Sequence, residues 1–152
     1  MTKSPTDSFQ QIIRDRRSTR KFEAGREVDR AVLQRIVDCG RWAPSGANTQ
    51  CWDFIVVDDP AMREAVRQIF LRQAQRLVDH AKGFPAVSKS YLSNTVAIVL
   101  VLGDPRWKVC FPQATSPEWE TEYDENNEAI FLCSLGAAIQ NIQLGVTAEG
   151  LT

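Results

Sequence analysis

The segment 16–22 combines four cationic side chains with two hydroxyls in seven residues: Arg16, Arg17, Ser18, Thr19, Arg20, Lys21 and Phe22. In an extended backbone, alternate side chains point the same way, so Arg16, Ser18 and Arg20 could face one ligand together. Guanidinium groups bind phosphate through paired hydrogen bonds, and a hydroxyl adds a neutral donor. The alternative is a solvated basic helix end that complements the helix dipole.

A second candidate site is the run of small and polar residues 43–52, APSGANTQCW, which leads into the apolar segment DFIVV at 53–57. The run joins the end of an amphipathic helix to a predicted strand. Turns of this kind present backbone groups and short side chains to ligands in open αβ scaffolds. We therefore expect a binding site here.

Composition argues against several other classes of function. A single histidine, His80, and four cysteines without a CxxC pair make metal catalysis and Ser-His or Cys-His chemistry unfavourable, so we assign no metal ligand and no catalytic residue. The formal net charge of -1 gives no global field for nucleic acid. No apolar run approaches the roughly 20 residues that cross a bilayer, and no signal region is visible. We expect a cytoplasmic protein with free thiols.

A third stretch, FLCSLGAAIQNIQLGVTAEGL at 131–151, completes a specific pattern. In this order the three stretches resemble the FMN-dependent nitroreductase family, which carries RRS-x-R-x-F, then APS-x-x-N-x-QPW-x-F, then S-x-GAA-x-QN-x-L-x-A-x-x-x-GL. The resemblance covers nearly the whole chain. One departure is Cys51, which stands where the family has proline and is interpreted as a buried small hydrophobe, with a redox-active thiol as the alternative.

The resemblance implies an α+β fold with a central mixed sheet flanked by helices and a long central dimer helix. It also implies a homodimer that binds one FMN at each of two subunit interfaces. Arg16, Ser18 and Arg20 match the positions that hold the flavin phosphate, ribityl chain and pyrimidine edge, and Arg17 is counted with them. The positions that reach the FMN of the other subunit match Pro44, Ser45, Gly46 and Asn48.

The implied activity is ping-pong electron transfer from NAD(P)H through FMN to a nitroaromatic, a quinone or a similar small planar acceptor. The cofactor carries the electrons, so no general base is needed. Four aromatic residues in the segment 103–127, which we expect to be irregular, could frame such an acceptor or merely anchor a loop: Trp107, Phe111, Trp119 and Tyr123.

The elements that position these residues are predicted from capping and periodicity. Asp7, Asp29 and Asp59 are expected to cap three helices, the last with Pro60 in its first position and extending to about His80. A strand is expected at 52–57. A β-branched run at 95–102 predicts a strand buried on both faces at the centre of the sheet. A long apolar helix is expected from Glu128.

The chain is expected to form one domain, 1–152, but two strands are too few for an independent sheet. The family core normally continues past Gly150 and Leu151 with further strands and an arm that embraces the partner. We therefore expect a chain that lacks that C-terminal part. The alternative function is a non-catalytic remnant that serves in dimerisation or flavin binding.

Overall fold

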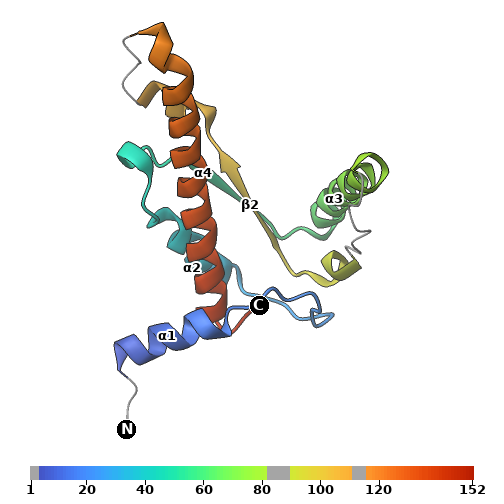
Figure 1. Ribbon diagram of the computed structural model, residues 1–152. Coiled ribbons are helices and arrows are strands. Elements are labelled where there is room, and N and C mark those ends of the chain that lie inside the picture. Colours follow the sequence, from blue (N-terminus) through green and yellow to red (C-terminus); the bar gives the residue numbers. More distant parts are fainter. Residues whose placement is uncertain (1–3, 82–89, 111–115) are drawn as a thin grey trace. The chain divides into compact units, whose positions relative to one another are not determined.

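The computed structural model describes residues 4–81, 90–110 and 116–152 (Figure 1). In order, the elements are α1 (Pro5–Asp15), α2 (Arg30–Arg41), the 3₁₀ turn η1 (Gly46–Asn48), β1 (Trp52–Val57), α3 (Pro60–His80), η2 (Ser90–Asn94), β2 (Ile98–Gly103), η3 (Pro105–Cys110) and α4 (Pro117–Ala148). The α+β class is confirmed.

The chain packs as two compact units. Unit 1 comprises residues 1–17, 29–55 and 101–152, and unit 2 comprises residues 18–28 and 56–100. Unit 1 thus holds α1, α2, η1 and α4, whereas unit 2 holds α3 and η2. That the whole chain forms a single domain stays a prediction.

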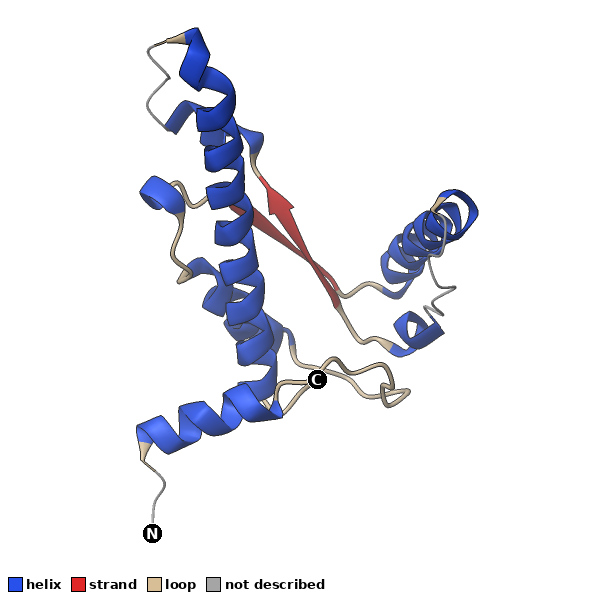
Figure 2. Cartoon of the chain, viewed as in Figure 1, coloured by secondary structure: helices blue, strands red, loops and turns tan. Residues whose placement is uncertain are grey.

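In the part of the chain that the structure describes, the sheet consists of β1 and β2 (Figure 2). The strands run antiparallel, because the Asp104 N–H just after β2 donates to the Cys51 carbonyl just before β1 at 2.9 Å. β2 was expected to be buried on both faces. It is instead half-buried at 98–101 and exposed at its end, because in the described residues β1 is its one neighbour.

Helix starts follow the capping signals with one shift. The side chains of Asp29 and Asp59 accept from backbone N–H groups two or three residues later, at 2.8 Å each, as predicted. The first helix is capped by Ser4 instead of Asp7, which occupies the third helical position. Ser4 Oγ accepts the Asp7 N–H at 3.1 Å, and the Asp7 carboxylate accepts the Ser4 N–H at 3.3 Å. Asp7 is therefore the distal half of a capping box.

Helix α4 begins at Pro117, eleven residues before the expected start at Glu128. Pro117 occupies the first helical position and Glu118 lies in the first turn, where an acidic side chain complements the helix dipole. Trp119 and Tyr123 therefore lie on a helix instead of in an irregular segment. Phe111 and the side chain of Trp107 lie outside the described residues.

The core of unit 1 is the contact of α4 with α2 and with the segment around β1. The two helices run side by side (Figure 1). Their backbones approach closely, because a Cβ on Gly40 would meet Ile142 at 2.9 Å and one on Gly145 would meet Cys39 at 2.9 Å. The buried core residues beside them are Ala43, Cys51, Trp52 and Ala138. Cys51 is 3% exposed, which confirms it as a buried small hydrophobe.

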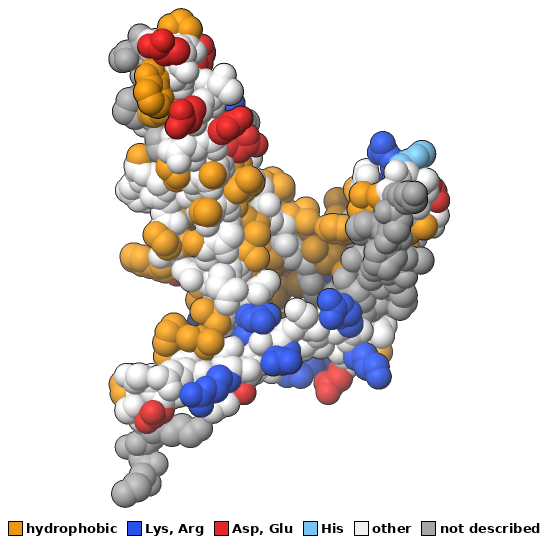
Figure 3. Space-filling view, in the orientation of Figure 1, with side chains coloured by type: hydrophobic (Ala, Val, Ile, Leu, Met, Phe, Trp, Pro, Cys, Tyr) orange, Lys and Arg blue, Asp and Glu red, His pale blue; other side chains and the backbone are white. Residues whose placement is uncertain are grey.

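Helix α4 separates charge from apolar surface along its length. Acidic side chains gather toward its N-terminal end and hydrophobic ones along its middle (Figure 3). By length and composition alone it is the one described helix that could cross a membrane, with a mean hydropathy of 1.5 over an 18-residue window, although core helices of soluble proteins meet the same criteria. The absence of a membrane partner stays a prediction.

Candidate functional site

The segment that joins α2 to β1 is held in place by two serine hydroxyls. Ser45 Oγ accepts the Gln50 N–H at 2.9 Å and closes the turn on itself. Ser134 Oγ, on α4, accepts the Gly46 N–H at 3.1 Å and donates to the Ile130 carbonyl at 2.7 Å. We call residues 45–50 the site loop. Its shape is set both by its own residues and by a helix far along the chain.

The site loop contains three residues with left-handed backbone although none is glycine: Ala47 (φ 49°), Asn48 (φ 54°) and Gln50 (φ 46°). Asparagine adopts this region readily, but alanine and glutamine do so rarely. Such conformations cost about 1–3 kcal/mol each and cluster at functional sites. The loop is therefore a strained segment whose hydrogen bonds offset the cost of its shape.

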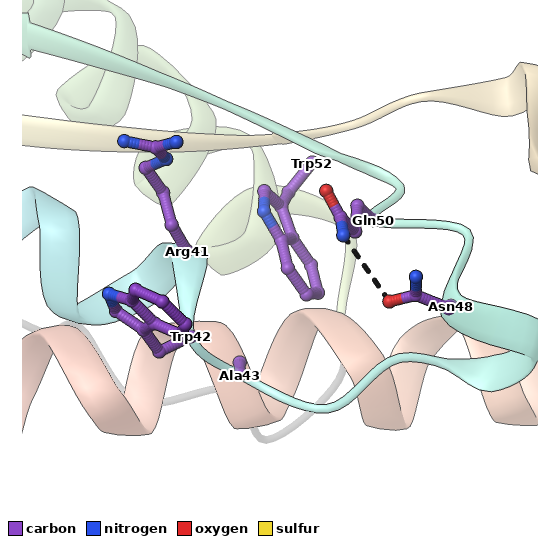
Figure 4. Close-up of a pocket in the computed structure, with 6 residues that line it drawn as sticks. All are labelled: Arg41, Trp42, Ala43, Asn48, Gln50 and Trp52. Atoms are coloured by element: carbon purple, nitrogen blue, oxygen red, sulfur yellow. Dashed lines mark hydrogen bonds between the residues drawn. The ribbon is translucent and has the colours of Figure 1, made fainter.

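A cavity of about 440 Å³ opens beside the site loop (Figure 4). Its lining residues come from the end of α2, the loop and the start of β1: Arg41, Trp42, Ala43, Asn48, Gln50 and Trp52. Pockets of this size and mixed lining accept small organic ligands. The exposed Trp42 indole offers a flat apolar face, and the largely buried Trp52 indole forms part of the wall. The Arg41 guanidinium, which donates to the Asp38 carboxylate at 2.9 Å, adds polar character, so the lining suits a planar and polar ligand.

The amides of Asn48 and Gln50 meet at the cavity, where Gln50 Nε2 donates to Asn48 Oδ1 at 3.3 Å (Figure 4). The bond uses one donor of Gln50 and one acceptor of Asn48. A primary amide has two N–H donors and a carbonyl oxygen with two lone pairs, so the two side chains keep further donors and acceptors for a ligand. Asn48 was among the predicted site residues, whereas Gln50 was not.

Trp42 is 81% exposed, and sequence reasoning missed it as a site residue. The buried face of α2 comprises Leu33, Ile36, Val37 and Gly40. Trp42 directly follows the last residue of α2 and does not continue the spacing of that buried face. A large aromatic side chain off the buried face was the available signal, because isolated exposed indoles are more common at binding surfaces than elsewhere.

The basic segment leaves α1 as irregular, extended chain. Arg16 caps the C-terminus of α1 through its N–H, which donates to the Ile12 carbonyl at 3.0 Å. Arg20 Nη1 donates to the Ser18 carbonyl at 3.3 Å. The side chains of Arg17, Ser18 and Arg20 are exposed, and Arg16 is half-buried. Arg16 and Arg17 belong to unit 1, and Ser18 and Arg20 belong to unit 2.

The other predicted site residues come together in unit 1. Gly46 and Asn48 lie in the 3₁₀ turn that Ser45 precedes, Pro44 lies directly before Ser45, and Asn48 lines the cavity. Within the described ranges, no group of three or more His, Cys, Asp or Glu side chains is placed to hold a metal ion. The role of all eight predicted residues in binding a cofactor stays a prediction.

An ion pair between Arg106 and Asp104 follows the end of β2, next to the point where the site loop leads into β1. Arg106 donates to the Asp104 carboxylate and lowers the pKa of that carboxyl from its ordinary value. The Asp104 N–H also holds the Cys51 carbonyl. The backbone hydrogen bond, and not the solvent-exposed ion pair, joins the end of β2 to the residue that precedes β1.

Residues 13–152 match the family model described as "Nitroreductase family". The chain belongs to the nitroreductase family. This nitroreductase-family chain is 27% identical to a Desulfovibrio desulfuricans protein whose crystal structure, described as that of a nitroreductase, is in complex with FMN. The TM-score is 0.60, and the match covers 97% of this chain and 65% of that one.

Curated relatives of this nitroreductase-family chain match over shorter lengths. It is 36% identical to iodotyrosine deiodinase 1 of Mus musculus over 64 residues, which cover 42% of this chain and 22% of the deiodinase. It is 26% identical to the CLA biosynthesis enone reductase of Lactiplantibacillus plantarum over 116 residues, which cover 76% of this chain and 45% of the reductase. The chain thus spans less than half the length of either relative.

Proposed function

We propose that this chain is an FMN-dependent oxidoreductase that passes electrons from NAD(P)H to a small planar acceptor, a nitroaromatic or a quinone, by a ping-pong mechanism. The observation that carries the proposal is the likeness to the Desulfovibrio desulfuricans protein in complex with FMN, which runs over 97% of the chain. We include a cytoplasmic location in the proposal, because the four cysteines are free thiols.

The basic segment fits the phosphate end of such a cofactor. Arginine keeps its charge at any physiological pH and forms two parallel hydrogen bonds to phosphate oxygens. The exposed side chains of Arg17, Ser18 and Arg20 leave room for an anion, and Arg16 is half-buried at the end of α1. These residues would hold the phosphate and the polar edge of the ring.

The site loop fits a planar ring. Its cavity offers the face of Trp42, a wall that includes Trp52, and the amides of Asn48 and Gln50, which suit a flat heterocycle with polar edges. FMN, when bound, supplies the two-electron redox chemistry. A fixed cation such as Arg20 would then favour negative charge at the polar edge and raise the reduction potential. For a two-electron couple, about 1.4 kcal/mol of such stabilisation corresponds to roughly 30 mV.

We also propose that the protein is a homodimer that joins along α4. One face of this helix exposes apolar and small residues at helical spacing: Leu132, Cys133, Gly136 and Ile139. Leu132 is 57% exposed, Ile139 is 41% exposed, and a Cβ on Gly136 would meet nothing within 4 Å. Large exposed apolar surfaces mark contacts with partners. A second copy would cover this face.

Flavin binding is tested directly on the purified protein. We expect a protein that has been mixed with FMN and then desalted to keep an absorption band at about 450 nm, and anaerobic NADH or NADPH to bleach it. Adding menadione or nitrofurazone should restore the band. A protein without the band after FMN addition contradicts the proposal and favours the non-catalytic remnant.

A second candidate activity is reductive deiodination, and the 36% identity to the mouse iodotyrosine deiodinase favours it. In that reaction two electrons and a proton replace the carbon–iodine bond by a carbon–hydrogen bond and release iodide. Iodide release from 3-iodotyrosine by the dithionite-reduced, FMN-loaded protein would support this activity. Turnover of the quinone alone would support the first.

A further inference from the structure

Ser134 lies at a point where helix α4 meets the site loop. It is 5% exposed, and it is one of the few polar residues in the core of unit 1. Its Oγ is 3.1 Å from the Gly46 nitrogen and 2.7 Å from the Ile130 carbonyl oxygen. One hydroxyl thus links the backbone of the helix to the backbone of the loop.

The Ser134 hydroxyl donates one of these two hydrogen bonds and accepts the other. A serine hydroxyl has one hydrogen and two acceptor lone pairs. The hydrogen goes to the Ile130 carbonyl, so a lone pair is left to accept the Gly46 N–H. An alanine at position 134 would leave that partly buried N–H without its hydrogen-bond partner. An unsatisfied buried donor costs more free energy than the hydrogen bond itself contributes.

The loop depends on such links because its backbone is strained. Gly46 opens the turn, and its carbonyl accepts the Thr49 N–H at 3.0 Å. The left-handed residues Ala47, Asn48 and Gln50 follow at once. Asn48 and Gln50 carry the amides that line the cavity. Any relaxation at Gly46 would therefore move the cavity lining.

We infer that Ser134 is a positioning residue: its hydroxyl holds the site loop in the strained shape that presents Asn48 and Gln50 to the ligand. The residue acts through the loop backbone and not on the ligand itself. The inference rests on the proposed function, because that function names the ligand as FMN. It adds a link from the helix proposed as the dimer contact to the cavity.

The test compares two helix hydroxyls that differ in one contact. Thr147 Oγ1 donates to the Gln143 carbonyl at 3.1 Å, the same bond to the preceding turn that Ser134 makes. Ser134→Ala removes that bond and the loop contact, whereas Thr147→Ala removes that bond alone. We expect Ser134→Ala to raise the Kd for FMN about threefold to tenfold and to change the visible circular dichroism of bound FMN. Thr147→Ala should leave both near the wild-type values.

Amide hydrogen exchange gives a readout that needs no cofactor. We expect the Gly46 and Gln50 amides to exchange faster in Ser134→Ala than in the wild type or in Thr147→Ala. Ser134→Thr keeps the oxygen and should restore protection. If Ser134→Ala does not fold, Ser134→Cys, which keeps a weak acceptor of similar size, should show intermediate protection.

The outcomes separate the two proposals. Faster loop exchange in Ser134→Ala alone, in a protein that binds no FMN, supports the positioning role and contradicts the proposed cofactor. A wild type that binds FMN, with unchanged Kd, dichroism and exchange in Ser134→Ala, overturns the positioning role. Equal effects of Ser134→Ala and Thr147→Ala also overturn it, because they would reflect helix stability.

Discussion

Gly145 of α4 lies directly against Cys39 of α2, and a Cβ atom on the glycine would come 2.9 Å from the cysteine Sγ. The same atom would lie 3.5 Å from the Ile36 carbonyl oxygen. The two helices therefore approach so closely that a Cβ at position 145 requires the Cys39 side chain or the helix to shift. Because the site loop follows α2 and is bonded to α4, this contact sets the frame of the cavity.

We expect Gly145→Ala to lower the free energy of unfolding. Overpacking a close helix contact costs about 1–3 kcal/mol, against which the better helix propensity of alanine returns up to about 1 kcal/mol. Urea denaturation followed by far-UV circular dichroism measures the difference. Adding Cys39→Ala removes the Sγ and should recover part of the loss. Equal stability of Gly145→Ala and the wild type would contradict this expectation and show that the packing cost is no larger than the gain in helix propensity, about 1 kcal/mol.

Much of the fold could be predicted because its signals are local. Asp29 and the pair Asp59-Pro60 each predict a helix start from no more than four residues, and the structure confirms both starts. The start of α4 was missed although Ser116, Pro117 and Glu118 give the same kind of signal. The acidic residues that follow hid the apolar periodicity, so the helix became recognisable only from Glu128.

The sequence predicts where the site lies but not the backbone conformation of its loop. The composition of residues 43–52 indicates a ligand-presenting turn, and the structure has a cavity there. Left-handed backbone at Ala47 and Gln50 could not be predicted, because neither residue type favours it. The contact of Gly46 with Ser134 joins positions 88 residues apart, and no local pattern encodes it.

The ion pair between Arg35 and Glu149 gives stability that depends on pH. The guanidinium donates two hydrogen bonds to the carboxylate, at 2.7 and 2.8 Å, and holds the pKa of Glu149 below its ordinary value. A lowered folded pKa adds stability above the unfolded carboxyl pKa of about 4.3, and that stability is lost as the pH falls through the folded value.

We therefore expect Glu149→Gln to lower the melting temperature slightly at pH 7, since the pair is solvent-accessible. The difference from the wild type should shrink below about pH 4.3 and vanish below the folded pKa. Differential scanning calorimetry across this range measures it. Arg35→Gln should behave alike, and the double variant should lose little more than either single one. A difference that persists unchanged in acid would show that the charge of Glu149 is not its cause.

The proposed dimer can be tested on the exposed face of α4. Ile139→Lys would place a charge where a second copy is expected to pack, and burying an unpaired charge is costly. We expect native mass spectrometry to report twice the chain mass for the wild type and the single chain mass for the variant. Met62→Lys on α3, a residue 57% exposed, is the control and should stay dimeric. A wild type of single chain mass at micromolar concentration would refute the dimer.

Trp42 provides a test of the cavity. Because it is 81% exposed, Trp42→Ala should leave the urea midpoint unchanged. If the cavity holds the FMN ring, loss of this aromatic stacking partner should raise the Kd for FMN about threefold to tenfold. Trp119→Ala on α4, where the indole is 59% exposed and outside the cavity lining, should change neither quantity. Equal Kd values for the two variants would place the flavin ring elsewhere.

Arg20 tests the basic segment. Its guanidinium is exposed and makes a long hydrogen bond of 3.3 Å to the Ser18 carbonyl, so little of its binding capacity is used within the chain. If it holds the polar edge of FMN, Arg20→Ala should raise the Kd for FMN about tenfold, since hydrogen bonds to charged groups contribute about 1.5–3 kcal/mol. It should also lower the flavin reduction potential, because a positive charge that favours the reduced form has gone. Fluorescence titration and an anaerobic dye-coupled redox titration measure the two effects.

The control for Arg20→Ala is Arg14→Ala, in the last turn of α1, which removes a positive charge outside the motif and should change neither the Kd nor the potential. An unchanged Kd and potential in Arg20→Ala would leave the basic segment as a solvated helix end, and an equal change in Arg14→Ala would reduce its role to net charge.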